Sequence, residues 1–444
     1  MQVSHQLISL LSALLALLLG LWGSVGLIVW FTFVGLLLYF LVAVTTRSHY
    51  YSRITVAYFL ILSLLSHLVW VDFQWASGSA LSGSDDTFFY QNATCIANSG
   101  FLCEQDAFSY FLVPFVILMG AVDTQTNIGV YAITSALTAL NFSLCKALSI
   151  RYFNTNVPSW LLLSSYFAVA QLFMNSMMLY REALVLLLLF GTIYFYGGTS
   201  RFKSGKILLS FLSASYLRVG SSIIAPFFIF LHLLRINSLR RATLCAGVFI
   251  IFLTIALNSL VPIVVSYGSS MTNLSRFSAF SEVSGEEILD QRMQKRSQGS
   301  IGDGRAESLK TTAFSSVTPE NIALRFLIPT AYPITFRPFS IDMPARHILA
   351  NISIVLKPLV IPLVLLGLLT LLRYPMGAPL LVSLFAYSLL VLLISGMPRH
   401  LMPVYWLMPI AAAIGWQRLR GKFELLLYSS AFLIIAITLV FLNG

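Results

Sequence analysis

Two adjacent carboxylates, Asp85 and Asp86, stand out in a chain of which only 10% of the residues are charged. They lie in the first long polar stretch, after three apolar segments. Neighbouring carboxylates repel each other and lose solvation beside a bilayer, so a loop rarely holds such a pair by chance. The pair could take a proton from a substrate hydroxyl, or it could hold a metal ion. A pair of solvated loop residues is the alternative interpretation.

A second set of polar residues could recognise a phosphate group. Arginine binds phosphate through a two-pronged guanidinium, and lysine supplies a compact charge. The candidates for substrate or phosphate binding are Tyr90, Arg181, Glu182, Arg218, Arg325, Arg337, Lys357, Arg399 and His400. Simpler roles stay open for several of them. Arg181 and Glu182 could form a local ion pair at a helix start, and Arg218 or Lys357 could extend to the membrane interface.

The elements that position these residues are expected to be transmembrane helices. Of the 444 residues, 58% are hydrophobic, and apolar runs long enough to cross about 30 Å of hydrocarbon recur along the chain. Polar and apolar residues do not alternate within the runs, which excludes a closed barrel. The expected fold is an all-α polytopic membrane protein with about 13 spans. These are 7–22, 25–44, 54–71, 127–148, 158–177, 182–197, 206–217, 220–236, 243–264, 351–373, 378–395, 401–416 and 424–442.

The placement of Lys and Arg predicts the orientation of these spans. With a cytoplasmic N-terminus, one set of loops is basic and contains Arg47, Arg53, Lys146, Arg151, Arg201, Lys203, Lys206, Arg235, Arg240, Arg241, Arg373, Arg418, Arg420 and Lys422. Basic loops face the cytoplasm. The net charge of +11 is therefore a topology signal, and no folded basic domain for nucleic acid is indicated. The expected location is the plasma (inner) membrane, with the active site on the extracytoplasmic side.

Five regions are expected from this topology. They are the N-terminal helices (1–71), a first extracytoplasmic loop (72–126), central helices (127–264), a large extracytoplasmic loop (265–350) and C-terminal helices (351–444). Residues 108–123 are expected to form an interfacial or re-entrant helix, since a full span there would reverse the basic loops that follow. Cys95 and Cys103, in the first outer loop, are expected to form a disulfide in an oxidising compartment, with two free thiols as the alternative.

The order of these features resembles the GT-C superfamily of integral-membrane glycosyltransferases. The matching positions are Asp85 and Asp86 with Tyr90, the Arg181–Glu182 pair that opens a later span, Arg218, and Arg399–His400 with Pro403 and Pro409. The resemblance extends over most of the chain, although its motifs are short. The chain departs from the protein mannosyltransferase type because it lacks a large C-terminal soluble domain and has an additional N-terminal hairpin. These departures leave the substrate class open.

The resemblance implies a polyprenyl-phosphate or polyprenyl-diphosphate sugar as the donor, and a glycan or lipid-linked acceptor. Asp85 or Asp86 would be the general base on an acceptor hydroxyl, which attacks the anomeric carbon with inversion. Arg399, with Arg218 or Lys357, would neutralise the departing phosphate. A Mg²⁺ or Mn²⁺ ion that bridges Asp86 and phosphate is an optional cofactor.

Two other functions fit the same sequence. A Wzy-type polysaccharide or O-antigen repeat-unit polymerase would use Arg325, Arg337 and Arg399 to bind two lipid diphosphates, and the Asp pair would matter less. A lipid-linked glycan transporter or flippase is the second alternative. Such proteins often have internal repeats and broken helices near the midplane, whereas the polar residues of this chain are expected to gather at one face.

Overall fold

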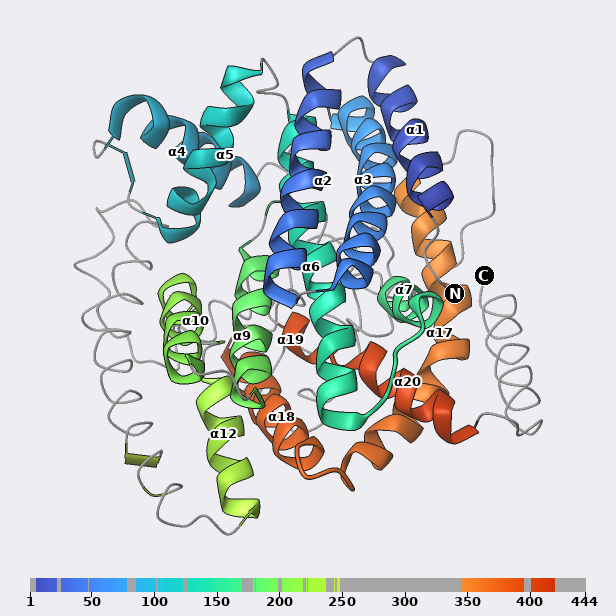
Figure 1. Ribbon diagram of the computed structural model, residues 1–444, viewed down its shortest axis with the longest axis vertical. Coiled ribbons are helices and arrows are strands. Elements are labelled where there is room, and N and C mark those ends of the chain that lie inside the picture. Colours follow the sequence, from blue (N-terminus) through green and yellow to red (C-terminus); the bar gives the residue numbers. More distant parts are fainter. Residues whose placement is uncertain are drawn as a thin grey trace.

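The computed structural model describes residues 5–21, 25–46, 48–77, 85–100, 103–104, 106–122, 127–169, 179, 181–198, 202–218, 221, 223–236, 243, 246–247, 345–394 and 401–419. Within these ranges every element is a helix and no strand occurs (Figure 1). The all-α class is therefore confirmed for the described part of the chain. The expected span 424–442 lies outside it, as does 243–264 except for residues 243, 246 and 247.

The helices follow the apolar runs of the sequence. In chain order they are α1 (His5–Leu21), α2 (Val25–Thr46), α3 (His49–Ser77), α4 (Asp85–Ser99), α5 (Ala107–Ala121), α6 (Asn127–Phe153), α7 (Ser159–Ala168), α9 (Glu182–Tyr196), α10 (Lys203–Leu217), α12 (Ile224–Arg235), α17 (Ala345–Leu371), α18 (Gly377–Ile394), α19 (Met402–Tyr405) and α20 (Met408–Leu419).

Several of these helices have the length and composition of membrane spans. Among the described residues, Val25–Thr46, His49–Leu68 and Gly129–Phe153 are long and apolar enough to cross a membrane. The two halves of α17, bent by 47° between Lys357 and Leu359, make a fourth when taken as a single span. The bend coincides with Pro358, which breaks the helical hydrogen-bond ladder. The full count of about 13 spans remains a prediction.

Small hydroxyl side chains join α3 to α6 in the centre of the bundle. The hydroxyls of Thr55 and Ser143 lie 2.5 Å apart, and those of Ser66 and Ser135 lie 3.3 Å apart. Thr55 precedes Ser66 in α3, whereas its partner Ser143 follows Ser135 in α6, so the two helices are antiparallel. In hydrocarbon, close packing of small residues and hydroxyl bonds across the seam hold helices together.

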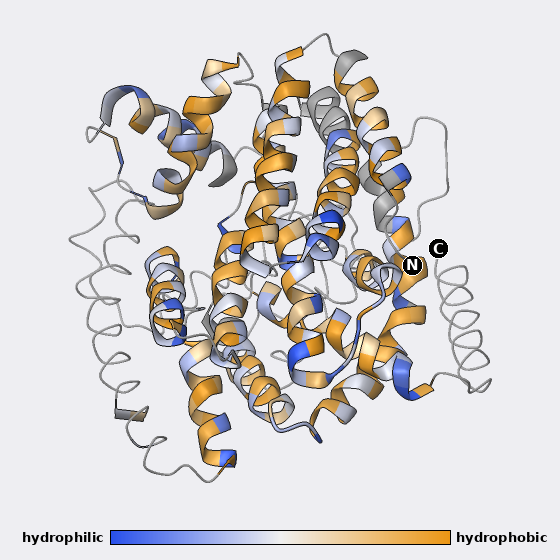
Figure 2. Cartoon of the chain, viewed as in Figure 1, coloured by the Kyte–Doolittle hydropathy of each residue, from blue (hydrophilic) through white to orange (hydrophobic). Residues whose placement is uncertain are grey.

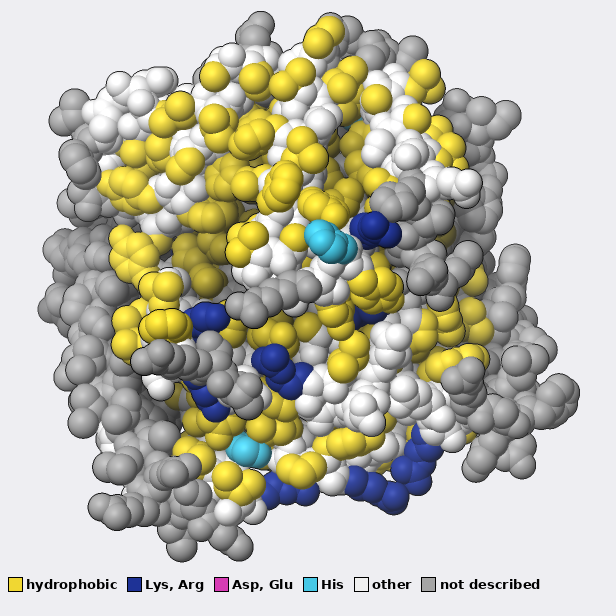
Figure 3. All heavy atoms as spheres, viewed as in Figure 1, with side chains coloured by type: hydrophobic (Ala, Val, Ile, Leu, Met, Phe, Trp, Pro, Cys, Tyr) yellow, Lys and Arg dark blue, Asp and Glu magenta, His cyan; other side chains and the backbone are white. Residues whose placement is uncertain are grey.

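Six of the cations in the described part of the chain gather at one end of the bundle, here called the basic end. They are Arg151, Lys203, Lys206, Arg235, Arg373 and Arg418, and many Lys and Arg side chains are visible in the lower half of Figure 3. The contacts that join the helix ends there are Arg151 with Tyr194, Lys203 with Tyr196, and Arg235 with Leu372. The sequence places these cations in one set of loops, and the structure brings them together. The compartment they face remains a prediction.

The outward surfaces of the helices are apolar, as a lipid-facing surface requires. Figure 2 shows hydrophobic residues along the exposed length of α2 and over much of α9 and α12, with hydrophilic residues more frequent at the basic end and in α4. On α10 the exposed apolar side chains are Leu208, Leu209, Leu212 and Tyr216. These faces fit the membrane setting that the composition predicts.

Helices α17 and α20 cross at two glycines. A Cβ atom on Gly367 would lie 1.7 Å from the carbonyl oxygen of Ala411, and one on Gly415 would lie 2.1 Å from that of Leu363. The two backbones are therefore in direct contact. Glycine permits this kind of close crossing between membrane helices.

We expect Gly367→Ala to destabilise the protein by about 1–3 kcal/mol, because the added methyl group must push α20 away. The measurement is the thermal unfolding midpoint in detergent. Gly205→Ala is the matched control, since a Cβ there would meet nothing within 4 Å and alanine favours the helix. A Gly367→Ala midpoint as high as that of the control would show that the helices do not cross so closely.

Candidate functional site

The Asp pair forms the first turn of α4. Asp85 and Asp86 are the first two residues of that helix, where carboxylates are favoured by the unpaired N–H groups and the helix dipole. The sequence predicts this stretch as loop, so α4 is an element that sequence analysis missed. The helix expected over residues 108–123 is present as α5, and its interfacial position remains a prediction.

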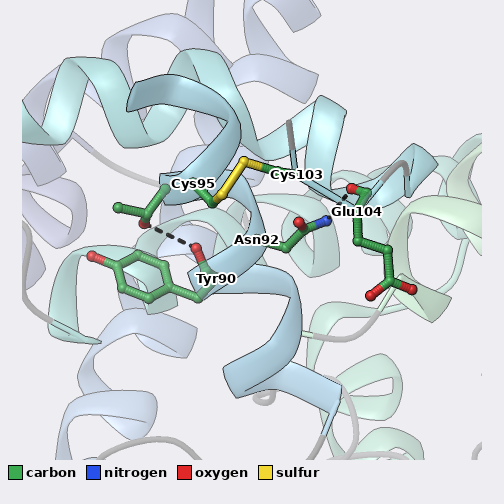
Figure 4. The surroundings of a disulfide bond; sticks show 6 residues. Tyr90, Asn92, Cys95, Cys103 and Glu104 are labelled. Atoms are coloured by element: carbon green, nitrogen blue, oxygen red, sulfur yellow. Dashed lines mark hydrogen bonds between the residues drawn. A yellow bond between two sulfur atoms is a disulfide. The ribbon is translucent and has the colours of Figure 1, made fainter. Parts of the chain in front are cut away.

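Helix α4 packs against α5 and is linked covalently to the segment that precedes α5. The rings of Phe89 and Phe108 meet edge to face, with centroids 5.1 Å apart. Cys95 and Cys103 form a disulfide, which confirms the pairing expected from the sequence (Figure 4). In Figure 1, α4 and α5 lie together above α9 and α10.

Arg181 joins α4 to the beginning of α9. Its guanidinium carbon lies 5.9 Å from the ring centroid of Phe89, in a cation–π contact. Phe89 follows Asp85 by four residues and Asp86 by three, so all three share one face of α4. The structure therefore brings the cation before α9 to the face of α4 that begins with the carboxylate pair.

Glu182 and Arg218 form an ion pair at the same end of α9. Arg218 donates to Oε1 of Glu182, and the two side chains are only 15% and 8% exposed, respectively. This is the one ion pair in the part of the chain that the structure describes. Glu182 begins α9, where the helix dipole favours a negative charge. The charge of Arg218 is thus balanced by Glu182, whereas no described carboxylate contacts Arg181.

The ion pair lies level with the middle of α6. Asn141, the fifteenth of the 27 residues of α6, donates a 2.8 Å hydrogen bond to the carbonyl of Ala183. Helix α9 therefore starts level with the middle of α6. Its 15 residues span about 22 Å at 1.5 Å per residue, which is shorter than the about 30 Å of hydrocarbon. The position of this start relative to the membrane remains a prediction.

Tyr387 is a neighbour of the pair that the sequence did not indicate. Its hydroxyl lies 3.1 Å from that of Ser221, and it is close enough to Arg218 and Glu182 to interact electrostatically with both. A tyrosine within an apolar run such as α18 carries no pattern that marks it as functional. Ser221 and Tyr387 link the ion pair to the start of α12 and to α18.

Two other candidate residues, Tyr90 and Lys357, are also described. Tyr90 is half-buried on α4, and burial raises the pKa of its phenol, which therefore stays protonated at neutral pH. Lys357 is buried on α17, which packs against α20 and α7 rather than α9. Four candidates lie outside the described residues, namely Arg325, Arg337, Arg399 and His400. The side chains of Asp85 and Asp86 are likewise outside the description.

Among the described residues, no further metal-binding side chains join the Asp85–Asp86 pair. No group of three or more His, Cys, Asp or Glu side chains that could hold a metal ion occurs among them. Two adjacent carboxylates offer few of the six ligands of octahedral Mg²⁺, with substrate phosphate and water as the other sources. The metal role suggested for Asp86 therefore remains a prediction.

Comparisons of the chain with protein-family models, with curated proteins and with solved structures give no match. Function is therefore inferred from the chain's own residues and their arrangement. That arrangement joins a helix beginning with two carboxylates, a cation over the same helix, and a buried Glu182–Arg218 pair directly beside that cation.

Proposed function

We propose that the protein is an integral-membrane glycosyltransferase of the GT-C type. It would move a sugar from a polyprenyl phosphate or diphosphate to a glycan or lipid-linked acceptor on the extracytoplasmic side. The contact of Arg181 with Phe89 carries the proposal, because it joins the carboxylate-bearing helix to a cation. Sugar transfer from a lipid phosphate needs both a proton acceptor and a group that stabilises the departing phosphate.

In the proposed reaction, Asp85 or Asp86 accepts the proton of an acceptor hydroxyl. The hydroxyl oxygen forms a bond to the anomeric carbon while the bond from that carbon to the phosphate oxygen breaks. The lipid phosphate or diphosphate leaves with the bonding electrons, and the configuration of the sugar inverts. Arg181 stabilises the negative charge that develops on the phosphate. It suits this role because Glu182 already balances the neighbouring Arg218.

A lipid-linked glycan flippase is the second candidate, and the position of the ion pair along α6 favours it. Ionisable residues near the midplane and interrupted helices are typical of substrate pathways in transporters. Glu182 and Arg218 lie level with the middle of α6, and α17 bends beside Lys357. Movement of labelled lipid-linked glycan across vesicles by the purified protein, with no acceptor present, would identify this activity.

The function is tested in the native host by deleting the gene and comparing the surface glycan by gel and mass spectrometry. We expect the deletion strain to lack a single sugar residue, which the wild-type gene restores. Loss of chain length with an intact repeat unit would contradict the proposal and indicate the polymerase. An unchanged repeat unit retained on the cytoplasmic leaflet would contradict it in favour of the flippase.

Arg181→Ala is expected to lower kcat/KM for the lipid-linked donor by about ten- to hundredfold, since a charge-assisted hydrogen bond to phosphate contributes about 1.5–3 kcal/mol. Arg181→Lys keeps the charge and should lose less. The measurement is transfer of labelled sugar from a polyprenyl-phosphate donor by the purified protein. Arg373→Ala, at an exposed arginine of the basic end, is the control. Equal kcat/KM values for Arg181→Ala and this control would remove Arg181 from the phosphate site.

A further inference from the structure

Two links tie the middle of α4 to the chain segment that follows it (Figure 4). The first is the disulfide between Cys95, within α4, and Cys103, beyond its end. The second is a 2.8 Å hydrogen bond from the Asn92 amide to the carbonyl oxygen of Glu104. Asn92 is only 7% exposed, and its bond to Glu104 is partly buried, so the bond is costly to leave unmade. Together they hold residues 103 and 104 alongside the helix.

The segment fixed by these links leads directly into α5. Asp106 accepts a 2.9 Å hydrogen bond from the backbone N–H of Ser109 and a longer one from its hydroxyl, which caps the start of α5. Phe108, in the first turn of α5, packs edge to face on Phe89 of α4. The links therefore set the position of α4 relative to α5.

Helix α5 is the helix against which α4 mainly packs. Phe89 of α4 also contacts Arg181, the residue that precedes α9. Phe89 lies six residues before Cys95, less than two turns along the same helix. The placement of the carboxylate-bearing start of α4 over Arg181 thus depends on how firmly α4 is held to α5, and the disulfide is the covalent part of that hold.

We infer that the Cys95–Cys103 disulfide and Asn92 form a clamp that positions α4 for catalysis, so that reduction of this bond lowers activity. The inference rests on the proposed function, because it assigns a task to the helix that carries Asp85 and Asp86. Reduction by a dithiol transfers two electrons and two protons, which gives two cysteine thiols and the cyclic disulfide of the reductant. In an oxidising compartment the clamp is closed. Released from it, α4 can move away from Arg181.

The clamp also gives Asn92 a structural task. Asn92, Ala93 and Thr94 form the acceptor pattern for N-glycosylation. The amide nitrogen that a glycan would occupy donates to the Glu104 carbonyl, and Asn92 as a residue is largely buried. In the folded protein, Asn92 therefore acts as a positioning residue and is closed to modification.

The test combines an activity assay with hydrogen–deuterium exchange of the α4 amides, before and after treatment with dithiothreitol. The protein used carries Cys145→Ala and Cys245→Ala, so that Cys95 and Cys103 are the remaining two of its four cysteines. We expect reduction to speed exchange over residues 85–99 and to lower transfer about a hundredfold, as misplacement of a reacting group by about 1 Å does. Reoxidation should restore both. Asn92→Ala, with the disulfide intact, should speed exchange to a smaller extent.

Alkylation of the thiols shows that the bond has been reduced. Unchanged exchange in reduced protein would overturn the clamp. Faster exchange with unchanged transfer would overturn its role in positioning the site. Failure of the proposed function has a different signature, because the oxidised protein would then transfer no sugar while exchange in α4 still responded to reduction.

Discussion

Asp85→Asn or Asp86→Asn is expected to lower sugar transfer by about 10²–10⁴-fold, the usual contribution of a general base. Asparagine has almost the size of aspartate and keeps a side-chain oxygen that can accept from the unpaired N–H groups of the first turn, so α4 should form in both variants. The amide cannot accept the proton of the acceptor hydroxyl. The general base is the aspartate whose replacement lowers the transfer rate, and the other variant should retain most of the wild-type rate. The measurement is the rate of transfer from a labelled lipid-linked donor.

Glu104→Gln is the matched control for this experiment. Glu104 is an exposed carboxylate in the same region, and Figure 4 shows its side chain directed away from Asn92, which bonds only its backbone. The same chemical change at this position should leave transfer at the wild-type rate. Wild-type rates in both Asp variants would refute the carboxylate mechanism, and the flippase or the polymerase would then be the better explanation.

The parts of the fold that local composition determines follow the sequence closely. The span expected over residues 25–44 corresponds to α2 (Val25–Thr46), and that over 127–148 to α6 (Asn127–Phe153). A long apolar run in a bilayer has few alternatives to a helix, since every backbone polar group must be bonded within the segment. The disulfide could also be predicted from the sequence, because the first outer loop contains just two cysteines, Cys95 and Cys103.

The parts that depend on distant contacts do not follow from the sequence. Helix α4 is polar enough to be mistaken for a loop, and its links to the segment before α5 and its contact with Arg181 become visible only in the fold. The level of Glu182 along α6 has the same origin. An apolar run gives the length of a helix but not the level at which it begins, which the bond from Asn141 to Ala183 shows.

Glu182→Ala is expected to destabilise the protein by about 3–5 kcal/mol, because it leaves Arg218 as a buried charge without its partner. Arg218→Ala should destabilise the protein by a similar amount, because it leaves the Glu182 carboxylate as a buried charge without its partner. Glu182→Gln should cost less, since the amide oxygen can still accept a hydrogen bond from the guanidinium. Unfolding in detergent, followed by temperature or denaturant, measures these differences. Single alanine variants as stable as the wild type would show that the pair is not shielded from water.

The double variant Glu182→Leu with Arg218→Met separates the stability of this pair from its function. Replacing both buried charges by apolar side chains of similar size is often neutral or stabilising, so the double variant should unfold at a higher temperature than either single alanine variant. If the pair only holds α9 to the end of α10, the double variant should also transfer sugar at the wild-type rate. We expect instead a stable protein with a raised KM for the donor. Arg218 would then assist Arg181 at the phosphate, and Glu182 would orient it for that task.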